Sequence, residues 1–170
     1  MKREQLSNTC YARIFISVVD IPKPKPLHFN REGTFKIMQI ADLHYSVSQG
    51  VCRNTDMSPP CKNGDVLTDS LLSRALDAEN PDLVVFTGDQ LNGQGTSWDS
   101  KSVLAKFAAT VIDRNISWAA IFGNHDDETD MSRKEEMKIL EKLPFSFSKA
   151  GPADVDGIGN YVLKVRSPDA

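Results

Sequence analysis

The chain has few cysteines, no large excess of either charge and no long apolar run, and each of these absences excludes a class of protein. The 20 Lys and Arg residues nearly balance the 23 Asp and Glu residues, so bulk charge does not drive binding to nucleic acid or to a membrane surface. No apolar run approaches the ~18 residues of a transmembrane helix, and residues 1–11 contain no apolar segment of the signal-peptide type. We therefore expect a soluble protein with no membrane or nucleic-acid partner, and the cytoplasm is slightly favoured as its compartment.

The three cysteines, Cys10, Cys52 and Cys61, are an odd number and contain no CxxC spacing, which argues against a zinc knuckle. Cys52 and Cys61 are close enough in the sequence to pair across their loop. The alternative is that both are free thiols, as in most intracellular proteins. The sequence leaves these two states open.

Apolar strand candidates alternate with amphipathic helix candidates along residues 34–170, a length that suits one domain. Asp65 is placed to cap the first helix, and Ser132 with Glu135 forms a capping box at the start of the third. The order predicts an α/β fold with parallel central strands in βαβαβ order, of which the first strand is buried. The predicted strands cover 34–41, 82–87 and 117–122, the predicted helices cover 65–79, 103–112 and 132–143, and further strand candidates cover 145–148 and 160–166.

Residues 1–33 form a separate N-terminal segment, with a strand candidate at 11–19 and then a proline-punctuated connector that cannot be helical. His28 lies in this connector, where an exposed or packing role is expected. Residues 46–63 form a long loop without periodicity, and loops of this length are usually functional or mobile.

Polar side chains follow each of the three main strand candidates. Asp42 and His44 follow the first, Asp89 follows the second, and Asn124 lies just after the third. Because the carboxyl ends of parallel strands lie together, we expect these side chains to converge on one crevice. Asp42 and His44 are two positions apart on an extended strand end, so both can face one cation. Asp89 can bridge this cation to a second one, to which Asn124 offers its carbonyl oxygen.

His125 follows Asn124 directly and is expected to lie near the metals without necessarily binding them. This position suits a proton donor to a leaving group or a cation that faces phosphate. Asp126 or Asp127 is expected to orient the ring. Glu128 lies in the acidic run that follows. We expect its negative charge to interact favourably with a helix N-terminus, and we do not expect it to bind a metal.

The segments IADLH, TGDQ and FGNHDD resemble, in type and order, the first three motifs of the calcineurin-like metallophosphoesterases. The resemblance spans roughly Phe35 to Val165, and LVVFTGDQLNG, AAIFGNHDDE and DVDGIGNYVLKV further resemble the fungal cell-cycle phosphatase and plant purple-acid-phosphatase-like subgroup. It implies the four-layer α/β/β/α sandwich of that family, with residues 34–170 as its N-terminal half.

The resemblance also implies a function. A centre of two metal ions, Fe, Mn or Zn, would hydrolyse phosphate monoesters of small molecules or phosphoproteins, with hydroxide held by the metals as the attacking group. Asp42 and His44 would hold one metal and Asp89 would be the bridge. Asn124 would hold the other metal and contact substrate, and His125 would be the catalytic histidine. A phosphodiesterase or nuclease built on the same core is the alternative.

Two departures from the family pattern limit these expectations. The family supplies further histidine ligands downstream, and no histidine follows His125 here, so each cation has about two protein ligands against the usual three or four. We therefore expect a fragment that is inactive or weakly active alone, with an exposed sheet edge, and a weak metal- or partner-binding module is the non-enzymatic alternative. In addition, Asn92 stands where purple acid phosphatases carry their tyrosine, so no coloured centre is expected.

Overall fold

A computed structural model describes residues 20–52, 56, 61–93 and 98–168. Strands and helices alternate along the chain: β1 (Ile37–Ile40), α1 (Gly64–Glu79), β2 (Leu83–Phe86), α2 (Ser100–Ile112), β3 (Trp118–Ala120) and α3 (Arg133–Leu140). The predicted α/β class is confirmed. None of the helices in these described ranges is long and apolar enough to cross a membrane.

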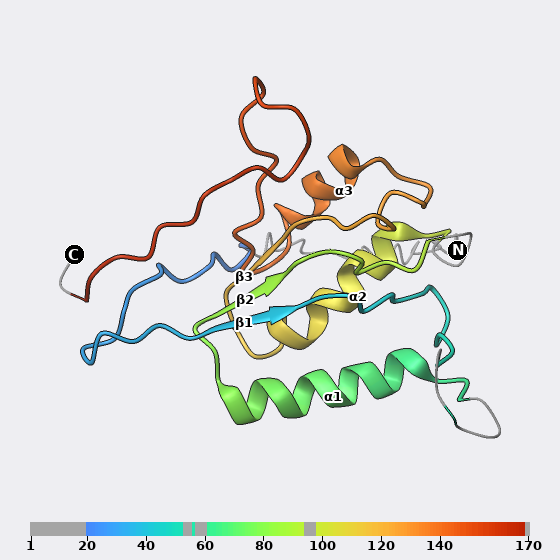
Figure 1. Cartoon of the computed structure of the whole chain (residues 1–170), viewed down its shortest axis with the longest axis horizontal. Coiled ribbons are helices and arrows are strands. Elements are labelled where there is room, and N and C mark those ends of the chain that lie inside the picture. Colours follow the sequence, from blue (N-terminus) through green and yellow to red (C-terminus); the bar gives the residue numbers. More distant parts are fainter. Residues whose placement is uncertain (1–19, 53–55, 57–60, 94–97, 169–170) are drawn as a thin grey trace, which may run out of the picture.

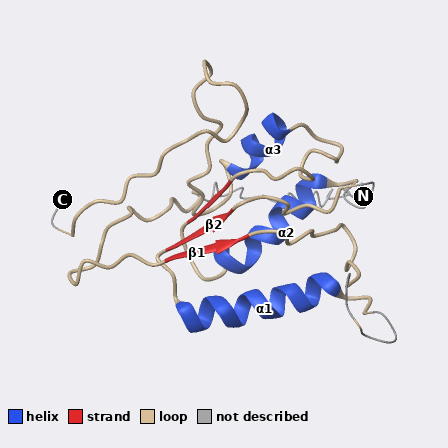
Figure 2. Cartoon of the chain, viewed as in Figure 1, coloured by secondary structure: helices blue, strands red, loops and turns tan. Residues whose placement is uncertain are grey.

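The sheet is parallel and its strands follow one another in the order β1-β2-β3. Because the crossovers between parallel strands are right-handed, a sheet that grows in one direction places its crossover helices on the same face. The helices accordingly lie in a row, with α2 between α1 and α3 (Figure 1). Long loops join these short elements (Figure 2).

The core lies between the helices and one face of the sheet. Ile40, Val84, Phe86, Trp118 and Ala120 supply the sheet side. The helices contribute Leu72 and Leu76 from α1, Val103, Leu104, Phe107, Ala108 and Val111 from α2, and Met137 and Leu140 from α3. At ~25 cal/mol per Å² of apolar surface, this burial is the main favourable contribution to folding. The carboxyl ends of the three strands are thereby held at one edge of a rigid layer.

The opposite face of the sheet is less covered. Ile37 points to this face and its side chain is 55% exposed, and Gln39 beside it is exposed as well. The expectation of a buried first strand is therefore wrong, because β1 is an edge strand with helices over only one of its faces. Met38 and Ile40 on the other face pack on or in the core.

Helix α1 differs from its prediction at its start. Asp65 does not cap the helix; Asn63 is the N-cap residue, without a side-chain hydrogen bond. Asp65 is instead buried, accepts a hydrogen bond from the Ser46 amide and forms an ion pair with Lys106 of α2 at 2.5 Å. The tertiary partner on α2 thus replaces the local capping interaction.

Helix α3 begins as its sequence predicts and ends earlier. The capping box is present, since the Ser132 side chain accepts from the Glu135 amide and the Glu135 carboxylate accepts from the Ser132 amide. The helix ends at Leu140 rather than Leu143, because turns that precede Pro144 replace its last helical residues.

The two strand candidates near the C-terminus are not strands. Residues 145–147 run beside β3, with the Phe147 amide donating to the Trp118 carbonyl, but only one bridge forms there. Residues 160–166 are held by a single bridge between Arg166 and His28, and Val162 is 90% exposed. The first candidate pairs with β3 at one residue only, and the second has no adjacent strand among the described residues. The strand candidate at 11–19 lies outside those residues.

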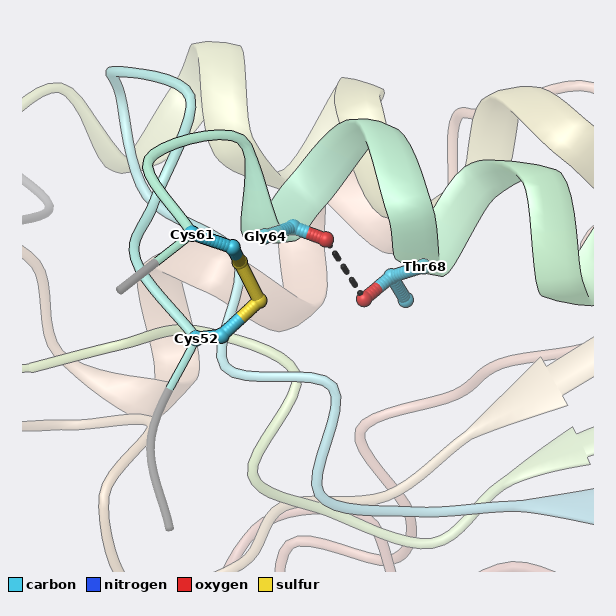
Figure 3. Close-up of a disulfide and its surroundings, with 4 residues drawn as sticks. All are labelled: Cys52, Cys61, Gly64 and Thr68. Atoms are coloured by element: carbon cyan, nitrogen blue, oxygen red, sulfur yellow. Dashed lines mark hydrogen bonds between the residues drawn. A yellow bond between two sulfur atoms is a disulfide. The ribbon is translucent and has the colours of Figure 1, made fainter. Parts of the chain in front are cut away.

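Cys52 and Cys61 form a disulfide, with their Cα atoms 5.3 Å apart (Figure 3). Of the two states that the sequence allows, the structure therefore has the paired one. The bond joins the loop after β1 to the residues that lead into α1.

Candidate metal centre

The loops that follow β1 and β2 continue the parallel pairing of these strands. The Asp42 amide donates to the Gly88 carbonyl at 3.1 Å, and the His44 amide donates to the Asp89 carbonyl at 3.0 Å. Beyond them, Tyr45 is fully buried and its hydroxyl donates to Asp69 of α1. The two loops are thus fixed to each other and to α1, which places Asp42, His44 and Asp89 at neighbouring positions.

These three residues have a backbone conformation that is rare outside glycine. The φ angles are 59° at Asp42, 48° at His44 and 54° at Asp89. Such left-handed residues cost roughly 1–3 kcal/mol each and concentrate at functional sites. The expectation of an extended strand end is therefore wrong for Asp42 and His44. Both residues have a left-handed backbone conformation, and in this conformation their side chains come close to each other.

Ligand atoms of Asp42, His44 and Asp89 all lie within 4.8 Å of one another. We call these three side chains the ligand cluster. The distance between His44 Nε2 and Asp42 Oδ1 is 3.8 Å, and Asp89 is the most buried of the three, with 8% of its surface exposed. One imidazole nitrogen with carboxylate oxygens suits Fe, Mn or Zn, so the donor set fits a transition metal.

Gly88 and Gly123 allow the second and third loops to approach closely. A Cβ atom on Gly88 would overlap the backbone of Gly123, and a Cβ atom on Gly123 would overlap the Asp89 carboxylate. Gly88 also has a φ of 116°, which other residues avoid. The two glycines before the polar residues are therefore required by the packing of the loops.

Asp126 is fully buried and accepts hydrogen bonds from four backbone amides. These are the amides of Asp89, Gln90, Leu91 and Gly123, at 2.7 to 3.0 Å. The carboxylate therefore joins the second loop to the third. The expectation that Asp126 orients the His125 ring is not what the structure shows, since both of its oxygens are used by these amides.

His125 borders the ligand cluster and has a different carboxylate partner. Its ring centroid is 5.6 Å from that of His44, and its amide donates to Asp89 Oδ1 at 2.8 Å. Its Nδ1 atom lies 3.0 Å from Glu128 Oε2, and this hydrogen bond raises the pKa of His125 above its usual value. The sequence analysis missed Glu128, although the spacing of three between it and His125 is a signal for such a contact.

The sequence model of the family described as calcineurin-like phosphoesterase matches residues 35–166. The chain belongs to the calcineurin-like phosphoesterase family. The resemblance drawn from the three motifs is therefore confirmed.

Three relatives of this chain carry phosphatase names. It is 38% identical to probable inactive purple acid phosphatase 14 of Arabidopsis thaliana, over 94% of this chain and 41% of that protein. It is 41% identical to phosphatase DCR2 of Saccharomyces cerevisiae, over 80% of this chain and 24% of that protein. Probable inactive purple acid phosphatase 29 of Arabidopsis thaliana is 38% identical, over 83% of this chain and 37% of that protein. The chain thus spans about two-fifths or less of the length of these relatives.

Asn124 and Asp127 complete the third loop of the site. Asn124 is exposed next to His125, and its role as a ligand of a second ion stays a prediction. Asp127 does not contact the His125 ring; it pairs with Arg133 of α3, whose Nη2 atom also donates to the Gly123 carbonyl at 2.9 Å. This arginine anchors the loop from its outer side.

Proposed function

We propose that the chain carries the metal- and phosphate-binding part of a phosphatase centre that hydrolyses phosphate monoesters, of a small molecule or a phosphoprotein. The observation that carries the proposal is the ligand cluster with His125 at its border. The phosphatase names of the relatives support the same activity.

Two metal ions, Fe, Mn or Zn, would activate water and neutralise phosphate oxygens when bound. Asp42 and His44 would hold one ion, Asp89 both, and Asn124 the other. Asn124 and His125 would also contact the phosphate.

His125 is the proposed proton donor to the leaving-group oxygen. With Nδ1 directed to Glu128, the other ring nitrogen, Nε2, is the one that carries and donates the proton. Gly93 supports this arrangement, because any Cβ atom there would press on the Glu128 side chain. The pair therefore depends on the packing of the second loop against the third.

The test combines metal binding with turnover on the whole 170-residue chain. We expect calorimetric titration with Mn²⁺ to show binding that Asp89→Asn abolishes and that Asp154→Asn, at an exposed position away from the cluster, preserves. Turnover of p-nitrophenyl phosphate should show the same dependence on Asp89. Metal binding that survives Asp89→Asn contradicts the proposed centre, and preferential cleavage of bis(p-nitrophenyl) phosphate contradicts the monoesterase assignment.

A non-catalytic metal-binding role is the second candidate, because two of the relatives are named as probable inactive phosphatases. This role predicts that the chain binds Mn²⁺ in an Asp89-dependent way without turnover of either ester. Turnover by the purified chain that disappears with Asp89→Asn would exclude it.

A further inference from the structure

A pocket of about 360 Å³ opens directly beside the ligand cluster. Asp42 and His44 form one end of it, and the segment Gly50–Cys52 and the first turns of α1 form its walls. Cys52 is held there by its disulfide to Cys61, and Thr68 lies opposite on α1 (Figure 3). Small-molecule sites usually have volumes of roughly 300–1,000 Å³, so this pocket suits a small group.

The walls away from the cluster are largely apolar. Leu43 and Val51 come from the loop after β1, and Leu67 and Leu71 come from α1. Leu67 is 45% exposed and Leu71 is 59% exposed, whereas Leu72 and Leu76 of the same helix are buried in the core. Exposed apolar side chains that gather around one hollow mark a binding surface better than the same residues scattered singly.

The charges around the pocket argue against a second anionic group. Among the described lining residues, none is Lys or Arg. Asp65 is the one carboxylate there besides Asp42, and Lys106 neutralises it in an ion pair with 5% of the Asp65 side chain exposed. Ser46, Thr68 and Asn92 add neutral polar atoms. The lining therefore suits an uncharged group that is mostly apolar.

We propose that this pocket binds the apolar, ring-sized group esterified to the phosphate, so that the substrates are aryl or similarly apolar phosphate monoesters. The inference rests on the proposed function, because the ligand cluster would hold the phosphate at one end of the same pocket. Since Asp42 and His44 belong to both sites, a phosphate at the cluster directs its ester group along the apolar wall.

The test uses hydrolysis-resistant phosphonates with the Mn²⁺-loaded chain. Benzylphosphonate and methylphosphonate share the anionic group and differ in the ring. Transferring a ring from water to an apolar wall is expected to give about tenfold tighter binding of benzylphosphonate by calorimetry. The double variant Leu67→Gln with Leu71→Gln should reduce this ratio to about one while leaving methylphosphonate affinity unchanged. Val66→Gln is the matched control, because Val66 is 49% exposed on the same helix and does not line the pocket.

The outcomes separate this inference from the function on which it rests. Equal affinities for the two phosphonates would contradict the proposed pocket, and so would an affinity ratio that the double variant does not change. Neither result would contradict the phosphate site. Absence of binding for both phosphonates overturns the proposed function and the pocket together. The ring could belong to a free aryl phosphate or to a phosphotyrosyl side chain. If a phosphotyrosine peptide binds as tightly as benzylphosphonate, the pocket is supported and the substrate is a phosphoprotein. If benzylphosphonate binds tightly and the peptide does not bind, the pocket is supported and the substrate is a small molecule.

Discussion

Replacing Glu136 with glutamine is expected to stabilise the fold at neutral pH. Glu136 of α3 is fully buried. Its Oε1 atom accepts a hydrogen bond from the Thr129 hydroxyl at 3.0 Å, and its Oε2 atom has no hydrogen-bond partner within the described part of the chain. Burial, together with the negative charges of Asp126, Asp127 and Asp130, raises the pKa of Glu136 from 4.5 to about 8. The carboxyl group is therefore protonated in the folded chain at neutral pH.

The sign of the effect follows from proton binding. Between pH 4.5 and about 8 the folded state binds more protons at Glu136 than the unfolded state, so the free energy of unfolding falls as pH rises through this window. At 1.36 kcal/mol per pH unit, the loss relative to low pH is about 3 kcal/mol by pH 7. Glutamine has a similar shape and no titration, so Glu136→Gln should recover most of this stability.

Urea unfolding at pH 5, 6, 7 and 8 measures the effect, with Glu32→Gln as a control at an exposed turn position. The difference between Glu136→Gln and the wild-type chain should grow steadily with pH, while Glu32→Gln should follow the wild-type chain. A difference that stays constant or shrinks as pH rises would refute the assignment of a buried, protonated Glu136.

Three further predictions concern the loops. Asp126→Asn, which replaces a carboxylate that accepts from four amides, should lower the free energy of unfolding by about 3 kcal/mol and weaken Mn²⁺ binding; an unchanged melting temperature would contradict this. Gly123→Ala should weaken Mn²⁺ binding at least ~10-fold, because the added Cβ atom would overlap the Asp89 carboxylate. The control Gly33→Ala has a φ of 75° and open surroundings, so it should lower stability without changing metal affinity. Equal metal affinities of the two variants would show that the overlap at Gly123 is relieved. Replacing Cys52 and Cys61 together by serine should cost about 2–3 kcal/mol in unfolding experiments, and dithiothreitol should reproduce this loss in the wild-type chain only.

The secondary structure was predictable where its determinants are local. The start of α3 depends on Ser132 and Glu135, which are three positions apart and interact within one turn. The start of α1 was mispredicted because Asp65 has an equally good local signal but a partner on α2 instead. No local sequence pattern indicates that Lys106 lies opposite Asp65, so the loss of the capping role could not be predicted from the sequence.

The ligand cluster was predictable from topology, because Asp42, His44 and Asp89 each follow a strand of one parallel sheet. The left-handed backbone conformation of these three residues could not be predicted, because neither Asp nor His requires it. The roles of Asp126 and Glu128 depend on how the third loop turns. Asp126 was therefore expected to orient His125, which it does not do, and Glu128, which does contact His125, was expected only to act near a helix N-terminus.

The four amides bound by Asp126 have a consequence for mutational tolerance. At Gln90 and Leu91 the carboxylate contacts main-chain atoms only, which every residue except proline provides. Binding to Asp126 therefore places no demand on the side-chain identity at these two positions. A deep mutational scan should find proline excluded at both positions, while the burial of Leu91 in the core and the hydrogen bond from Gln90 Nε2 to the Gly88 carbonyl limit the other substitutions. Asp126 therefore fixes the backbone of this segment, and separate contacts decide which side chains it carries.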